Sequence, residues 1–301
     1  MSVPAAYFTV ILVWSTSPLG IVWSSETVNP TLAVLARMLI AVILGWLIIK
    51  ACKIELPLTR QAFKIYGYST IGIFGGMLFA YVAARYIPSG LMSLVFGLAP
   101  VISGVLAQKL LNEPKFSTTK KLALLFSIAG LGIVCYDNIF SAGNTLSSNS
   151  YIGIGAVLCG VFFFSLSGVL VKSVDIKIHA LSTTVGSLTC SLPLFLAVWL
   201  IFDGTLPVDE WEKRSLFAIL YLGVFGSLIA FIAYYYVLQK LSASTVALIT
   251  MITPVIALCF GAFFNNEPIS DNLIIGASFV MGGLALYQWG GRKRTKVTVS
   301  T

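Results

Sequence analysis

Long apolar runs, separated by short polar segments, occupy most of the 301-residue chain. A helix needs about twenty apolar residues to cross the hydrocarbon core of a bilayer, and ten runs approach or reach that length. We expect all ten to be helices, because a helix satisfies its own backbone hydrogen bonds in lipid. The runs cover residues 5–23, 31–49, 65–84, 88–111, 122–137, 151–171, 180–202, 215–238, 243–264 and 272–290. The pattern therefore predicts an all-α integral membrane protein with ten transmembrane helices.

The composition indicates lipid as the solvent of this chain. Apolar residues make up 58% of it, charged residues 10%, and the mean hydropathy is +0.95, whereas soluble domains are about 25% charged. The net charge of +8 does not indicate a nucleic-acid partner, because the bases lie in short clusters between apolar runs. The five cysteines form no CxxC pattern and no Cys/His cluster, so neither a metal nor a cofactor is expected.

The distribution of Lys and Arg predicts the orientation of the chain. With a cytoplasmic amino terminus, 15 of the 19 basic residues lie on inner segments. Only Arg85, Lys213 and Arg214 then lie outside, and Arg37 lies within a span. Cytoplasmic loops carry an excess of Lys and Arg. We therefore expect both termini in the cytoplasm, with residues 291–301 as a basic tail.

An internal repeat divides the chain. At an offset of 154 residues, Asn112-Glu113-Pro114 aligns with Asn266-Glu267-Pro268, and Pro100 aligns with Pro254. The expected division is a first five-helix repeat in 1–140, an outer linker in 141–150 and a second five-helix repeat in 151–290. Because five is odd, the second repeat enters the membrane from the opposite side. Inverted repeats are typical of alternating-access carriers, whose substrate sites lie near the midplane between the repeats.

Pro100 and Pro254 fall in the middle of their predicted helices. Each lacks the N–H that would bond the carbonyl four residues earlier, which belongs to Phe96 or Thr250. In one interpretation these carbonyls accept from a substrate ammonium or hydroxyl. In the other, a neighbouring hydroxyl such as that of Ser93 satisfies them, and the prolines act as kinks that assist gating.

Several aromatic side chains lie too deep for the interfacial belt that explains most membrane Trp and Tyr. They either line a substrate pocket or pack against lipid and other helices. Tyr81 and Tyr235 are repeat mates near opposite mouths, placed to close over a substrate in alternate states. The predicted substrate-binding residues in and around the pocket are Trp14, Ser15, Phe74, Met77, Tyr81, Phe96, Phe163, Ser167, Tyr235 and Thr250.

Charged residues provide few further candidates. Arg37 is the one full charge well inside a span, and it either binds a substrate carboxylate, snorkels to the outer interface or bonds carbonyls at the end of another helix. Glu113 and Glu267 each end a helix beside a Pro, and we expect each to accept from the free N–H groups that open the next helix near Ser117 or Ser270. No titratable group is expected at the midplane, so tight proton coupling is not expected.

Taken together, these motifs resemble the drug/metabolite transporter superfamily, in its ten-helix EamA-type branch. The matching pieces are Trp14-Ser15, Ala36-Arg37, the two prolines, and the two Asn-Glu-Pro segments, each followed by a Ser and a Gly-rich helix. The resemblance covers about residues 5–290. It implies a carrier or exporter of amino acids, other small metabolites or drugs, usually in the bacterial inner membrane.

The sequence thus predicts a multi-pass inner (plasma) membrane transporter that exports small amphiphilic metabolites, such as amino acids, through a midplane pocket. Its expected partners are a small-molecule substrate and membrane lipid, with the chain a monomer or weak homodimer. A membrane enzyme is disfavoured, because the chain has one His and no carboxylate pair inside the membrane. A non-transporting membrane subunit, or a component of a lipid or drug flippase, is the alternative.

Overall fold

The computed structural model describes residues 2–140, 149–174, 176, 178–241 and 249–292, so most of the predicted linker and the basic tail lie outside the described residues. The described residues form helices and connecting turns, with no strand among them. In chain order the helices are α1 (Val3–Ser24), α2 (Pro30–Cys52), α3 (Arg60–Ala83), α4 (Ser89–Phe96), α5 (Ala99–Leu110), α6 (Thr118–Phe140), α7 (Ser150–Lys172), α8 (Ala180–Phe202), η1 (Val208–Glu210), α9 (Lys213–Tyr221), η2 (Leu222–Ile229), α10 (Ala230–Lys240), α12 (Ile249–Asn265) and α13 (Asp271–Arg292).

Seven helical stretches in the described part of the chain are long and apolar enough to cross a membrane. They are α1, α2, α3, α7 and α8, together with the combined stretches Ser89–Leu110 and Lys213–Lys240. Two shorter apolar helices lie within α12 and α13. The chain is therefore an all-helical, multi-pass membrane protein, and each of the ten predicted runs overlaps at least one of its helices.

Two of the predicted helices are not continuous. The run at 88–111 is divided into α4 and α5 by a turn at Gly97 and Leu98, so Pro100 lies in the first turn of α5 and not in a helix interior. A proline fits there because the first N–H groups of a helix have no intrahelical acceptor. The run at 215–238 contains the π-helical segment η2. Pro254, by contrast, lies inside the continuous helix α12.

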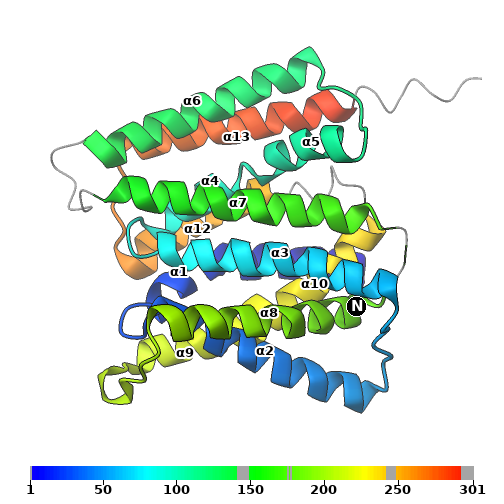
Figure 1. Cartoon of the computed structure of the whole chain (residues 1–301). Helices are drawn as coiled ribbons and strands as arrows, with labels where there is room; N and C mark the ends of the chain where they lie inside the picture. Colours follow the sequence, from blue (N-terminus) through cyan, green and yellow to red (C-terminus); the bar gives the residue numbers. More distant parts are fainter. Residues whose placement is uncertain (1, 141–148, 175, 177, 242–248, 293–301) are drawn as a thin grey trace, which may run out of the picture.

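Helices that are distant in the sequence pack side by side. In Figure 1, α6 and α13 run together at one edge of the bundle, and α2 and α8 lie toward the other. Between these edges, α3 packs along α7, and α1 contacts α9, α10 and α12. The α6–α13 crossing is close, since a Cβ added to Gly130 would lie 2.5 Å from the Gly276 carbonyl oxygen.

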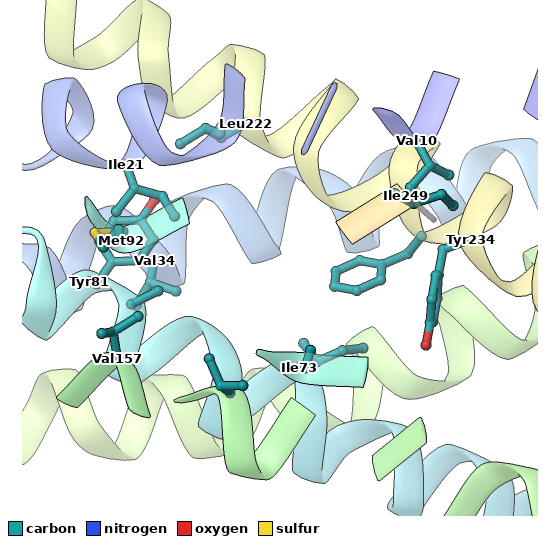
Figure 2. Close-up of a cluster of buried hydrophobic side chains, with 14 of the residues drawn as sticks. Val10, Ile21, Val34, Ile73, Tyr81, Met92, Val157, Leu222, Tyr234 and Ile249 are labelled. Atoms are coloured by element: carbon teal, nitrogen blue, oxygen red, sulfur yellow. The ribbon is translucent and has the colours of Figure 1, made fainter. Parts of the chain in front are cut away.

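Apolar side chains from many helices form the core. Figure 2 shows Ile21, Tyr81 and Met92 gathered from α1, α3 and α4, while Tyr234 and Ile249 lie together farther along the bundle. All five belong to one buried cluster. The core therefore ties helices of the first half of the chain to helices of the second half.

The two Asn-Glu-Pro segments adopt the same local structure. Asn112 and Asn266 have φ values of 53° and 50°, in the left-handed region that ends a helix. The N–H groups of Glu113 and Glu267 donate to carbonyls six residues earlier, at 3.3 and 3.1 Å. These turns lie at opposite ends of the bundle, and α1 begins at the same end as the α5–α6 loop (Figure 1). We call the two ends the Glu113 end and the Glu267 end.

The serine that follows each segment caps the next helix. The Ser117 hydroxyl accepts from the Lys120 N–H at 3.3 Å, and the Ser270 hydroxyl accepts from the Leu273 N–H at 3.1 Å. A serine oxygen is well suited to this position because it reaches the free N–H groups of the first turn. The serines therefore provide the cap, and the prediction that Glu267 caps the helix that follows it is wrong, because its carboxylate accepts from the first N–H groups of α4.

Candidate substrate site

A cavity of about 90 Å³ lies between helices of the two halves. Trp14 of α1 and Met77 of α3 line it from the first half, and Phe164 of α7 and Gly226 of η2 line it from the second. The full set of lining residues is Trp14, Ser17, Pro18, Ile21, Gly76, Met77, Ala80, Met92, Ser93, Phe96, Ala99, Phe164, Gly226 and Thr253. The lining is mostly apolar, with three hydroxyl side chains.

Aromatic rings form one wall of this cavity. Phe164 is central, with its ring centroid 5.7 Å from that of Trp14 and 6.4 Å from that of Phe96, both in edge-on arrangements. Tyr234 extends the cluster, 5.1 Å from Trp14 and 5.8 Å from Phe164. Such packing holds the rings in place and presents aromatic faces to an apolar or cationic group.

Two backbone carbonyls at the cavity lack their usual helical partner. Pro18 lies inside α1 and has no N–H to donate to the carbonyl of Trp14, four residues earlier. The carbonyl of Phe96 belongs to the last turn of α4, where carbonyls have no partner within the helix. Trp14, Pro18 and Phe96 all line the cavity, so these carbonyls are the candidate acceptors for an ammonium or hydroxyl of a bound molecule.

A smaller cavity adjoins the aromatic wall. It has a volume of about 10 Å³, and Phe164 lines both cavities. Its polar lining consists of Ser69 and Ser167 together with Tyr234 and Tyr235. This volume is about that needed by one water molecule. The smaller cavity therefore offers hydroxyl groups but little room.

Arg37 lies beside the main cavity and is fully buried. Its Nε donates to the Ser227 hydroxyl at 2.9 Å, and its guanidinium carbon lies 5.8 Å from the centre of the Tyr81 ring. Two of the alternatives considered for Arg37, snorkelling to the interface and bonding helix-end carbonyls, do not fit, because the side chain is buried and its hydrogen-bond partner among the described residues is the Ser227 hydroxyl of η2. The π-helical turn of η2 brings this serine to the arginine, and such turns are frequent at functional sites.

Hydrogen bonds join helices of both halves at the Glu267 end. The Glu267 carboxylate accepts from the N–H groups of Ser89 and Gly90, each at 3.1 Å, where α4 begins. Trp23 of α1 donates to the Asn265 side chain at 2.9 Å. Glu267 thus caps α4, far away in the sequence, and not the helix that follows it. Glu113, its repeat mate, has an exposed side chain.

The profile of the EamA-like transporter family matches this chain twice, over residues 3–136 and 151–288. The chain belongs to the EamA-like transporter family. Its two matches together cover most of the chain and divide it where the sequence repeat does.

Known proteins similar to this EamA-like transporter include the uncharacterized transporter YoaV of Bacillus subtilis (strain 168), 22% identical over 92% of this chain and 93% of YoaV. PagO of Salmonella typhimurium is 25% identical over 91% of this chain and 89% of PagO, and PecM of Dickeya dadantii is 27% identical over 89% and 87%. A crystal structure with 19% identity has a TM-score of 0.69 and covers 97% of this chain and 98% of its own. At 19% identity, the similarity to this solved structure is evidence for the fold and not for the function.

The EamA-like fold brings part of the predicted site together. Trp14, Met77 and Phe96 line the main cavity. Ser167 and Tyr235 line the smaller one. The side chain of Thr250 lies outside the described residues, and Arg37 and Tyr81 contact each other beside the main cavity.

Arg37 and Tyr81 line neither cavity, and the same holds for three further predicted residues, Ser15, Phe74 and Phe163. The Ser15 hydroxyl donates to the Ile11 carbonyl of its own helix at 2.7 Å. Phe74 packs on Phe195, with ring centroids 5.0 Å apart. Phe163 stacks on Phe79 at 5.8 Å.

The predicted set includes three of the fourteen residues that line the main cavity, and the missed ones include Phe164 and Pro18. Phe164 is the third residue of a Phe triplet, of which only the middle one was chosen. Pro18 is a proline inside the first apolar run, so the rule applied to Pro100 and Pro254 would have found it.

Proposed function

We propose that this protein is a secondary transporter that exports a small amphiphilic metabolite, such as an amino acid, by alternating access. The observation that carries the proposal is the main cavity, which is lined by helices from both halves of an EamA-like transporter. It combines aromatic faces for an apolar body with carbonyl and hydroxyl groups for a polar head. In carriers built from inverted repeats, such a site lies near the membrane midplane.

In this proposal the protein lies in the inner (plasma) membrane, its two halves are inverted repeats, and both termini are in the cytoplasm. Two features support it. The Asn-Glu-Pro turns have the same backbone geometry at opposite ends of the bundle. The helix pairs are also related by exchange of the halves, since α3 packs on α7 as α1 packs on α10.

In the proposed cycle, the Glu267 end and the Glu113 end open in turn. Opening the Glu267 end requires the loss of the Glu267 bonds to α4 and of the Trp23–Asn265 bond. It also requires the Ser24–Tyr81 hydroxyl contact, 3.2 Å long, to break. These few bonds cross between elements that must separate, so the closed state is held by interactions that a conformational change can replace.

The test is transport by the purified protein in liposomes. Vesicles loaded with unlabelled L-leucine or L-phenylalanine should accumulate the labelled amino acid by exchange, and empty vesicles should not. Trp14→Ala should lose most of this exchange while remaining folded. Absence of exchange in the wild type with both amino acids would contradict the proposal and favour a non-transporting subunit or flippase component.

The orientation is tested separately by labelling single cysteines in intact cells. On a cysteine-free background, an impermeant maleimide should modify a cysteine that replaces Asn266 and spare one that replaces Asn112. Modification of both from outside would exclude the inverted arrangement, whatever the transport result.

A further inference from the structure

The guanidinium of Arg37 is a buried cation with an incomplete set of partners. Its exposed fraction is 0%. Nε is bonded to Ser227, but Nη1 and Nη2 have no hydrogen-bond partner among the described residues. Each of these nitrogens carries two N–H groups. A buried charge that lacks partners is costly, and in membrane proteins such residues mark ligand or ion pathways.

Two acidic side chains at this end of the bundle, those of Glu26 and Glu267, are already engaged. Glu26 accepts from Arg214 at 2.7 Å, and Glu267 accepts from the first N–H groups of α4. The Tyr81 ring offers Arg37 a π face at 5.8 Å, which stabilises a cation but does not bond its N–H groups. Within the described residues, Arg37 therefore has a hydroxyl acceptor for Nε and an aromatic ring beside its guanidinium. Its two terminal nitrogens, Nη1 and Nη2, have no acceptor.

The Nη2 atom of Arg37 lies next to the main cavity. Gly226 lines that cavity, and a Cβ added at Gly226 would lie 3.0 Å from Nη2 of Arg37. Any side chain larger than hydrogen at this position would thus crowd the space between the guanidinium and the cavity. The π-helical segment η2 supplies both Gly226, which keeps this space open, and Ser227, which orients Nε.

We infer that Arg37 binds the carboxylate of the transported molecule, which makes the substrate class an α-amino acid with an apolar side chain. Nη1 and Nη2 present N–H groups in the planar geometry that matches two carboxylate oxygens. The apolar side chain then packs on Trp14, Met77 and Phe164, and the ammonium reaches the Trp14 carbonyl freed by Pro18. The inference rests on the proposed function and names the substrate class of the same site.

Acid and amide pairs test the carboxylate directly. The detergent-solubilised protein is heated with L-leucine, L-phenylalanine, L-leucinamide or L-phenylalaninamide, each in the millimolar range. A ligand that binds the folded state raises its apparent stability. The two acids should raise the melting temperature of the wild type and the two amides should not. Equal shifts with an acid and its amide, or no shift with either acid, would overturn the inference.

Variants then assign the effect to Arg37. Arg37→Met should lose the response to both acids, and Gly226→Ala, which keeps the arginine but crowds Nη2, should weaken leucine binding at least tenfold. Arg214→Met is the matched control, because it removes an arginine paired with Glu26 at the same end and should bind leucine as the wild type does. Gly226→Ala keeps the test decisive where Arg37→Met fails to fold. Unchanged leucine binding in Gly226→Ala would overturn the inference.

The inference and the proposed function can fail separately. If the protein binds leucine in preference to leucinamide but does not exchange leucine in liposomes, Arg37 is a carboxylate site and the protein is not the proposed carrier. Leucine exchange that leucinamide inhibits equally well, or that Arg37→Met leaves intact, would sustain the carrier and refute the site.

Discussion

Replacing Glu267 with Gln should weaken the closure of the Glu267 end. The carboxylate accepts from the N–H groups of Ser89 and Gly90, both at 3.1 Å. A hydrogen bond to a charged acceptor contributes about 1.5–3 kcal/mol, and a negative charge at a helix N-terminus about 0.3–1 kcal/mol. Gln keeps one acceptor oxygen and loses the charge, so the closed end loses about 2–4 kcal/mol by these figures. At about 1.4 kcal/mol per factor of ten, the population of the closed arrangement falls about 20- to 700-fold relative to the open one.

The assay measures access to a reporter behind this closure. Ile21 lines the main cavity and is 4% exposed. On a cysteine-free background, a cysteine at Ile21 should react with an impermeant maleimide at least tenfold faster in Glu267→Gln. Glu113→Gln is the matched control, since it changes the repeat mate, whose side chain is exposed, and should leave the rate unchanged. Equal rates in Glu267→Gln and its parent would refute the assignment of Glu267 as the residue that closes this end.

Three further outcomes are expected. Phe164→Ala should weaken leucine binding at least tenfold, whereas Phe163→Ala, which removes a ring outside the cavity, should change it less than twofold in the same thermal-shift titration. Gly130→Ala should destabilise the α6–α13 crossing by about 1–3 kcal/mol through overpacking, while Gly132→Ala, where an added Cβ meets no atom within 4 Å, should not lower the melting temperature. Leucine exchange in liposomes should be insensitive to an imposed pH gradient, because none of the residues lining the main cavity is titratable; uphill accumulation driven by the gradient alone would contradict this.

The helical membrane fold could be predicted because the lipid constraint acts on each segment by itself. A run of about twenty apolar residues has no stable alternative in hydrocarbon. The Asn-Glu-Pro turns could be recognised for a similar reason, since Asn ends a helix in the left-handed region and Pro cannot continue it. Local rules therefore located the turns, while the partner of Glu267 lies 178 residues away in the sequence, at Ser89, and no local rule reaches it.

The side chains of the cavity could be predicted only in part. Trp14 and Phe96 were found because they lie too deep in their apolar runs for the interfacial belt of aromatic residues. Sequence reasoning selected Phe163, whereas Phe164 lines the cavity, and the difference matters because neighbouring residues on a helix point about 100° apart. Which of them faces inward depends on the rotation of α7 against α3, and that rotation is set by close packing at Gly72 and Gly75. The π turn of η2 likewise depends on tertiary packing that periodicity does not encode.

An incompletely bonded, buried guanidinium destabilises the carrier when the cavity is empty, and it can bind the substrate carboxylate when the cavity is occupied. Ser227 and the Tyr81 ring offset only part of the desolvation of Arg37. On the proposed mechanism, a carboxylate bound at Nη1 and Nη2 offsets more of the desolvation free energy of Arg37. This stabilisation is largest when the cavity is closed and water no longer screens the two charges. Substrate binding would then favour the enclosed, loaded state over the enclosed, empty one. A carrier with that preference crosses between its two open states mainly when loaded, which is the behaviour of an exchanger. The same arginine would then provide both recognition and coupling, with the charge supplied by the substrate and not by a protonated residue in the cavity.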